Sequence, residues 1–198
     1  MITGNSNTGF AAVQALAKKY HDQVYIRALV RTNDKKAKFQ ELKHVDVVAG
    51  IDATRPDAAD DALFGVDSCF ITSPNFAENR AELQIALVDA AKKAGVKHVV
   101  LMSVQGAQWE AITFAKQFRK VEKHLEASGL AYTHIRASMF MDNFIGSKTS
   151  IVDGGAIYGC HGDGKYSTVA MEGNIRAVLS SLSVTADPTF YSLQTWAT

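Results

Sequence analysis

The stretch Ile2-Thr3-Gly4-Asn5-Ser6-Asn7-Thr8-Gly9 stands between the end of a predicted strand and a segment with helical periodicity. Glycines in such a strand-to-helix turn let the backbone approach phosphate groups, and the helix N-terminus supplies N–H groups with a partial positive charge. A complete dinucleotide-binding fingerprint has three glycines, whereas only Gly4 and Gly9 are present here. The turn predicts a modified phosphate-binding loop, with a plain strand-to-helix turn as the alternative.

Two arrangements would account for the missing middle glycine. Asn7 could replace it, since asparagine tolerates positive φ better than most residues. Alternatively, the turn is one residue shorter, which we favour because residues 9–16 then fall into helical register. In both arrangements the candidates for contact with a dinucleotide are Gly4, Asn7, Thr8 and Gly9.

Short β-rich runs alternate with longer helical segments along the rest of the chain. The predicted strands are 24–30, 45–49, 66–72, 98–102 and 131–135, and residues 189–193 could form a last strand. The predicted helices are 10–20, 77–94, 109–127 and 172–182. This alternation is typical of repeated βαβ units. It predicts an α/β fold of the Rossmann type, a doubly wound, mostly parallel sheet with helices on both faces.

Length and composition are ordinary for one globular domain. The chain has 198 residues, of which 47% are apolar and 21% are charged. No repeat or linker divides it, so we expect a single domain over residues 1–198. Within it we expect a nucleotide-binding core over 1–145 and a reduced substrate-side region over 146–198. Gly95 and Gly129 each follow a predicted helix, where a C-terminal glycine cap is expected.

Charge and residue content argue against several other classes of protein. A net charge of +1 gives no field to attract a polyanion, so we expect no nucleic-acid partner. No apolar stretch reaches the roughly 18 residues of a membrane span, so we expect no membrane partner and a cytoplasmic location. The two cysteines are too few for a disulfide scaffold, and the histidines lack metal-ligand spacing, so no metal is expected.

The residues after the strand predicted at 24–30 indicate the preferred dinucleotide. An acidic residue there favours the ribose 2′-hydroxyl of NAD(H), whereas a basic residue favours the 2′-phosphate of NADP(H). Arg31 stands at this position, and its planar guanidinium suits a phosphate. Lys35 follows one turn later, although Asp34 argues the other way and an exposed basic loop is the alternative. We predict NADP(H) rather than NAD(H).

With these residues in place, the sequence resembles the NmrA-like atypical short-chain dehydrogenases. That family includes NADPH-dependent quinone and dye reductases and also redox-sensing regulators. The resemblance covers most of the chain and is most specific at residues 128–136 (SGLAYTHIR) and 139–144 (MFMDNF). Further matches are the glycine turn, residues 28–31 (ALVR), residues 50–52 (GID) and residues 99–103 (VVLMS).

The resemblance implies cofactor-binding residues at strand ends or just beyond them, the edge where open α/β sheets bind ligands. Thr8 and Gly9 would contact the phosphates, and Arg31 would contact the 2′-phosphate. The adenosine side would be lined by Asp52, Ala53, Thr72, Ser73 and Pro74, and the nicotinamide side by Ser103, Met139, Phe140, Asn143 and Phe144. Of these, Phe144 is also a candidate for substrate contact.

Three departures from the family pattern concern catalysis more than binding. The middle glycine is missing, few residues precede Thr3, and the chain stops near residues 191–193, where relatives continue into helices that cover the substrate. We therefore expect a shortened C-terminal substrate part, with a pocket that is open or is closed by a partner.

A complete catalytic apparatus is not recognisable in the sequence. Classical members pair a tyrosine acid with a lysine four residues later, and none of the six tyrosines has this neighbour. Many NmrA-like relatives keep a lysine four residues before a glutamate, but here Phe118 precedes Glu122 at that spacing. Lys116 is the remaining candidate catalytic cation, whereas Lys120 and Lys123 are interpreted as parts of a solvated basic helix face. Tyr158 and His161 could line a substrate pocket, or they belong to a flexible loop.

These observations lead to two functional hypotheses. The first is a reductase that transfers a hydride from NADPH to a quinone or other small carbonyl acceptor, the protein orienting the cofactor ring and excluding water. The second is a non-catalytic NADP(H) sensor that acts on a regulatory protein partner. A homodimer and a degenerate domain that binds no nucleotide remain open alternatives.

Overall fold

The computed structural model describes residues 1–4, 6–50, 56–73, 79–159, 162–165, 167–183 and 191–194. Its main sheet has the strand order β3-β2-β1-β4-β5-β6-β9, and every neighbouring pair is parallel. The strands are β1 (Ile2–Thr3), β2 (Ile26–Val30), β3 (Val45–Ala49), β4 (Ser68–Ile71), β5 (His98–Val104), β6 (Ala131–Ala137) and β9 (Tyr191–Gln194). The order 3-2-1-4-5-6 confirms the predicted doubly wound Rossmann fold.

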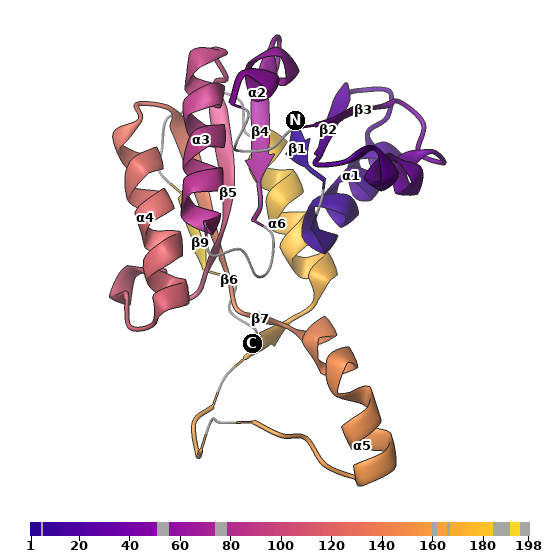
Figure 1. Cartoon of the computed structure of the whole chain (residues 1–198), viewed down its shortest axis with the longest axis vertical. Coiled ribbons are helices and arrows are strands. Elements are labelled where there is room, and N and C mark those ends of the chain that lie inside the picture. Colours follow the sequence, from indigo (N-terminus) through magenta and orange to yellow (C-terminus); the bar gives the residue numbers. More distant parts are fainter. Residues whose placement is uncertain are drawn as a thin grey trace.

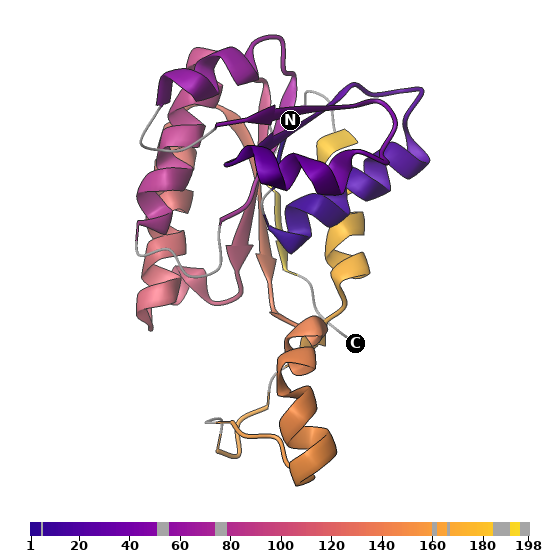
Figure 2. The same ribbon diagram turned by 45° about the vertical axis from the view of Figure 1, so that its right-hand side comes forward.

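Helices cover both faces of this sheet, as predicted. The helices α2 (Pro56–Leu63), α3 (Arg80–Lys93) and α4 (Thr113–Ala127) pack on one face (Figure 1). The helices α1 (Asn7–Lys19) and α6 (Met171–Ser183) pack side by side on the other face (Figure 2). The winding reverses between β1 and β4, and at such a switch point the strand ends leave room for a ligand.

The side chains of β5 alternate between two hydrophobic clusters on opposite faces of the sheet. Val99 and Leu101 pack toward the α3 and α4 side, and Val100 and Met102 pack toward the α1 and α6 side. Because side chains on a strand alternate between its two faces, Ser103 lies on the same face as Val99 and Leu101 and points toward α4. A polar residue at the end of the buried strand is therefore aimed at a specific helix.

A smaller unit extends from the end of β6. The strand β7 (Met139–Phe140) pairs in parallel with β8 (Thr168–Val169), forming a second, two-stranded sheet. Between them, the 3-10 helix η3 (Met141–Ser147) and the helix α5 (Lys148–Gly154) form an arm that projects away from the main sheet (Figure 1). Apolar side chains on the described part of this arm, such as Val152, are exposed.

The predicted element bounds differ from the structure mainly at helix starts. The helix predicted from residue 109 begins at Thr113, since Ala107–Trp109 forms a 3-10 helix (η2) and Glu110 has a φ of 50°. The helix α2 was not predicted. The expected glycine caps are confirmed, because Gly95 and Gly129 have φ values of 74° and 83°.

Candidate functional site

A cleft of about 680 Å³ opens at the carboxyl ends of β1, β4, β5 and β6. Its volume falls within the range of typical small-molecule sites. One side is formed by the N-terminus of α1, the other by α3 and α4, and β7 closes one end. The lining residues are Ser6, Asn7, Thr8, Thr72, Ser73, Arg80, Met102, Ser103, Val104, Gln105, Phe114, Phe118, Ala137, Ser138, Met139, Phe140, Asp142, Asn143 and Met171.

The glycine turn forms the N-cap of α1. Ser6 is the N-cap residue, and its Oγ accepts a hydrogen bond of 2.9 Å from the backbone N–H of Gly9. Asn7 is already the first helical residue, and among the described residues positive φ outside glycine occurs at His44 and Glu110. The interpretation of Asn7 as a positive-φ substitute for glycine is therefore wrong. The turn ends directly in the helix.

Hydroxyl groups fix this turn to the end of β4. The backbone N–H of Thr72 donates to Thr3 Oγ1 at 2.7 Å. The hydroxyl of Thr72 also lies 2.7 Å from Ser6 Oγ and 3.0 Å from Thr3 Oγ1. These bonds hold the N-terminus of α1 at a defined position beside the cleft.

The cleft brings together many of the residues that the sequence predicted. They come from the ends of four strands and the segments after them: Asn7, Thr8, Thr72, Ser73, Ser103, Met139, Phe140 and Asn143. Gly4 and Gly9 are buried within the turn and are not among the lining residues. Asp52, Ala53, Pro74 and His161 lie outside the described residues.

Other predicted residues lie away from the lining of the cleft. Lys116 is exposed, although Phe114 and Phe118 on the same helix line the cleft. Residues two apart on a helix point in nearly opposite directions, which explains this difference. Phe144 is half-buried in η3, and Tyr158 is 82% exposed on the arm.

The residues after β2 form a basic surface near α1. Arg31 and Lys35 are exposed, and Lys35 Nζ lies 3.3 Å from the carboxylate of Asp34. Lys38 was not among the residues predicted from the sequence, and its Nζ lies 4.8 Å from the centroid of the Phe10 ring. Burial, followed by the charge of Lys35, lowers the pKa of Lys38. This basic surface lies next to β2. The strand β1 separates it from β4 and β5, whose ends carry the cleft residues.

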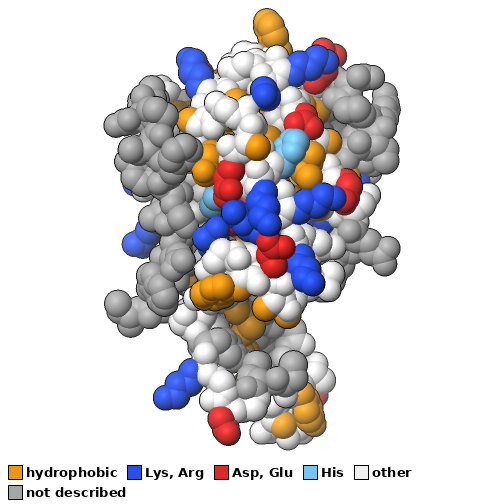
Figure 3. Space-filling model, turned by 90° about the vertical axis from the view of Figure 1, so that its left-hand side faces the viewer, with side chains coloured by type: hydrophobic (Ala, Val, Ile, Leu, Met, Phe, Trp, Pro, Cys, Tyr) orange, Lys and Arg blue, Asp and Glu red, His pale blue; other side chains and the backbone are white. Residues whose placement is uncertain are grey.

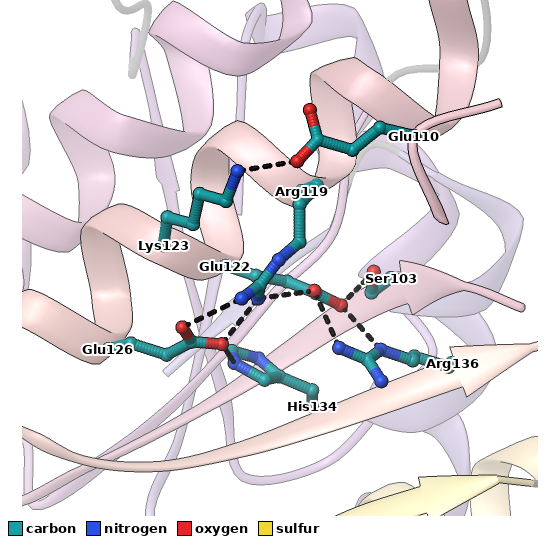
Figure 4. Close-up of polar contacts among 8 residues, drawn as sticks. All are labelled: Ser103, Glu110, Arg119, Glu122, Lys123, Glu126, His134 and Arg136. Carbon is teal, nitrogen blue, oxygen red and sulfur yellow. Dashed lines mark hydrogen bonds and ion pairs between the residues drawn. The ribbon is translucent and has the colours of Figure 1, made fainter. Parts of the chain in front are cut away.

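Ser103 connects the cleft to a buried carboxylate. Its hydroxyl donates to Glu122 Oε1 at 2.7 Å, and Arg136 Nε and Nη2 donate to the two oxygens of Glu122 at 2.9 and 2.8 Å (Figure 4). Glu122 is fully buried. Burial by itself would raise the pKa of Glu122, but the hydrogen bonds from Arg136 and Ser103 outweigh it and hold this pKa at about 2.

The depressed pKa of Glu122 predicts a pH-dependent stability. In the unfolded chain this carboxyl has its ordinary pKa of 4.5, against about 2 in the folded protein. Its contribution, about 3 kcal/mol from the size of the shift, is complete above pH 4.5 and is lost as the pH falls through about 2. Urea denaturation between these pH values should show this decline. The free energy of unfolding should fall less steeply with decreasing pH in Glu122→Gln than in the wild type. An equal dependence on pH in both proteins would contradict the depressed pKa of Glu122.

The ion pairs continue from Glu122 along α4. Arg119 Nη1 donates to Glu122 at 3.0 Å and also binds the carboxylate of Glu126. Glu126 in turn lies 3.3 Å from His134 Nε2 (Figure 4). We refer to Ser103, Arg119, Glu122, Glu126, His134 and Arg136 as the buried charge network. It ties α4 to β5 and β6 behind the cleft.

On the surface, two lysines of α4 form ion pairs with acidic side chains. Figure 3 shows basic and acidic groups interspersed on this side of the molecule. Lys120 pairs with Glu82 of α3, and Lys123 pairs with Glu110. The interpretation of Lys120 and Lys123 as parts of a solvated helix face agrees with these pairings.

Sequence reasoning missed Arg80 and Phe114 in the cleft, and the role of Glu122 behind it. The register of the sheet pairs Ser103 with Arg136 on the neighbouring strand, which places both beside α4. A serine and an arginine at adjacent strand ends were a usable signal for a buried acid on the covering helix. Nothing local to Arg80 marked it as a cleft residue, because its aromatic neighbours lie on another helix.

Comparison with known proteins agrees with this geometry. A family profile described as NAD(P)H-binding matches residues 4–160. The chain belongs to the NAD(P)H-binding, NmrA-like family. The NAD(P)H azoreductase of Xenophilus azovorans is 29% identical over 170 residues, which cover 85% of this chain and 57% of that protein. Quinone oxidoreductase 2 of Escherichia coli K12 is 30% identical over 124 residues, covering 60% and 43%. The chain thus spans about half the length of these curated relatives.

A solved structure extends the similarity over nearly the whole chain. The NADPH-dependent quinone oxidoreductase of Escherichia coli, crystallised with NADPH, superposes with a TM-score of 0.84 at 26% identity. The match covers 96% of this chain and 66% of that one.

In the described part of this NmrA-like chain, no helix has the length and apolarity to cross a bilayer. Within the same residues, no cluster of three or more His, Cys, Asp or Glu is arranged to hold a metal ion.

Proposed function

We propose that this protein binds NADP(H) along the cleft and reduces a quinone or another small carbonyl acceptor. The observation that carries the proposal is the continuity of one cleft from the N-terminus of α1, across the ends of β4 and β5, to Met139 and Phe140. That path begins at a site for anions and ends at an apolar site beside hydroxyl groups, as a dinucleotide requires. The similarity to NADPH-dependent quinone oxidoreductase supports the same assignment.

The residues present fit the parts of the dinucleotide. The first-turn N–H groups of α1, at Asn7 and Thr8, would hold the diphosphate. Met139 and Phe140 would flank the nicotinamide ring and exclude water from it. When bound, NADPH supplies the hydride, and water supplies the proton that completes reduction of the acceptor.

Ser103 is suited to hold a ribose hydroxyl. Its own proton is donated to Glu122, which is ionised at neutral pH because its pKa is about 2. The serine oxygen therefore has its lone pairs available toward the cleft, where it would accept a hydrogen bond from the sugar. The buried charge network fixes the direction of this acceptor.

The basic surface after β2 supports a preference for the phosphorylated cofactor. Arg31, Lys35 and Lys38 place positive charge at the edge where the adenosine half of a dinucleotide ends in this fold. We assign the 2′-phosphate contact to Arg31, with Lys35 and Lys38 adding to the local field.

Thermal unfolding in the presence of NADPH, NADP⁺, NADH and NAD⁺ tests cofactor binding. A cofactor at about 100 times its Kd stabilises the fold by roughly 2.7 kcal/mol, which raises Tm by about 5–10 °C for a chain of this size. We expect this shift in Tm with NADPH and NADP⁺, and a smaller shift with NADH and NAD⁺. The variant Arg31→Ala should lose most of this preference for the phosphorylated cofactors. Lys18→Ala, which removes an exposed cation from α1, is the matched control. An unchanged preference in Arg31→Ala would contradict the assignment of Arg31.

Quinone-dependent oxidation of NADPH, followed by its absorbance, tests the reaction. Turnover is the expected result. Cofactor binding without turnover on any quinone would instead favour the NADP(H)-sensing hypothesis and a regulatory partner. Absence of stabilisation by all four nucleotides would reject both hypotheses, because each requires the same cleft to bind a dinucleotide.

A further inference from the structure

The cleft wall formed by α3 and α4 holds a cation to which the proposed function gives no role. Arg80 is the first residue of α3, is 3% exposed and lines the cleft. Its guanidinium carbon lies 4.4 Å from the centroid of the Phe114 ring and 5.1 Å from that of Phe118. At these distances both aromatic rings attract the guanidinium through cation–π interactions.

The position of Arg80 is unfavourable for stability in two respects. Burial lowers the pKa of Arg80, because surroundings of low dielectric constant disfavour its charge. The first turn of a helix also disfavours a cation, since the helix N-terminus has a partial positive charge of its own. Departures from local stability rules are expected at functional sites, which makes Arg80 a candidate for ligand recognition.

Contacts between the two helices keep this wall in place. The rings of Phe114 and Phe118 pack edge to face, with centroids 4.9 Å apart. Lys120 of α4 donates to Glu82 of α3 at 2.8 Å, which joins the helices beside Arg80. The guanidinium is therefore positioned before a ligand arrives, and less conformational entropy is lost on binding.

Arg80 also determines the electrostatic character of the inner wall. Of the described residues that line the cleft, Arg80 and Asp142 carry charge, and Asp142 is exposed in η3. Water screens the exposed carboxylate, whereas the charge of Arg80 acts through a medium of lower dielectric constant. The inner wall therefore favours a ligand with a negatively charged oxygen.

We propose that Arg80 is a specificity-determining residue for the acceptor and selects planar acceptors that carry an anionic oxygen, such as acidic hydroxyquinones. The proposal rests on the proposed function, because the acceptor would occupy the same cleft as the cofactor. The guanidinium would donate charge-assisted hydrogen bonds to the anionic oxygen. Phe114 and Phe118 would supply apolar surface to the acceptor ring.

Binding of two matched naphthoquinones tests this proposal without turnover. The first carries one hydroxyl and one methyl group on its quinone ring and is an anion at neutral pH. The second, dimethylnaphthoquinone, has nearly the same shape and no charge. Calorimetric titration in saturating NADP⁺ should show that the wild-type protein binds the anion about tenfold more tightly, or better, as expected for a hydrogen bond between charged groups.

Three variants separate the charge of Arg80 from its packing. Arg80→Met keeps an apolar chain of similar length and should bind both quinones equally. Arg80→Lys keeps the charge but loses the planar donor, so it should retain part of the preference. Lys92→Met removes an exposed cation from the other end of α3 and should bind like the wild type.

The outcomes distinguish this proposal from the proposed function. A wild-type protein that is stabilised by NADPH but binds both quinones equally would overturn the role of Arg80 and leave cofactor binding intact. A preference that persists in a folded Arg80→Met would overturn it as well. If Arg80→Met does not fold, Arg80→Lys provides the test instead. An undiminished preference of Arg80→Lys for the anionic quinone would exclude recognition by the planar guanidinium. Absence of cofactor stabilisation in the wild type would instead be a failure of the proposed function.

Discussion

Replacing Glu122 with alanine is expected to lower the free energy of unfolding by about 3–5 kcal/mol. Glu122 is fully buried and accepts hydrogen bonds from Ser103, Arg119 and Arg136. Its removal would leave the charge of Arg136 largely buried and without its carboxylate partner, and it would open a cavity between α4 and the sheet. Urea denaturation monitored by circular dichroism measures the change.

Glu82→Ala is the matched control for this experiment. Glu82 pairs with Lys120 between α3 and α4, but the two side chains are 59% and 58% exposed. An exposed pair contributes at most about 1 kcal/mol, so this variant should be nearly as stable as the wild type. Glu122→Gln keeps the shape of the side chain without its charge. Its free energy of unfolding should lie between those of Glu122→Ala and Glu82→Ala. Equal stability of Glu122→Ala and Glu82→Ala would contradict the importance of the buried charge network.

The same substitution should also weaken cofactor binding in molecules that remain folded. Ser103 loses the acceptor for its proton when Glu122 is removed, so its hydroxyl is no longer held in one orientation. The stabilisation by NADPH should therefore decrease more in Glu122→Ala than in Glu82→Ala. This links the network behind the cleft to the function proposed for the cleft.

Local sequence patterns predicted the fold, and the family resemblance named the residues of the candidate site that lie at its strand ends. The strand at 45–49 agrees with β3, and the residues after β4 and β5 line the cleft as expected. Such positions follow from the pattern alone, because the carboxyl ends of parallel strands meet at one edge of the sheet. Thr72 and Ser103 themselves were named from the family resemblance, and their positions at strand ends agree with this rule.

The helical wall of the cleft could not be predicted in the same way. Arg80 meets Phe114 and Phe118 only because α3 packs against α4, and no local pattern relates these residues. Helical geometry alone could have weakened the case for Lys116. Residues four apart share a face, so Phe114 and Phe118 line the cleft together, and the residue midway between them points away.

Replacing Gly9 with alanine is expected to destabilise the fold by about 3 kcal/mol or more and to remove the response to NADPH. A Cβ at this position would lie 1.9 Å from the backbone oxygen of Thr3 and 3.2 Å from Ser6 Oγ. The contact is with backbone at the end of β1, so α1 would have to move away from the sheet. Gly9 is needed for close helix–strand packing, one of the glycine roles in a dinucleotide-binding turn.

Gly173→Ala in α6 separates this steric effect from the general effect of a helical glycine. A Cβ at Gly173 would lie 3.7 Å from the side chain of Val169, an ordinary contact, and alanine favours a helix by up to about 1 kcal/mol. This variant should be as stable as the wild type or more so, with an unchanged thermal shift in NADPH. If Gly9→Ala kept the same stability and the same shift, close packing of α1 would not be what positions its N-terminus, and the phosphate site would have to be sought elsewhere in the cleft. A folded Gly9→Ala that fails to respond to NADPH would instead show that the position of the N-terminus of α1, and not merely an intact fold, is what binds the diphosphate.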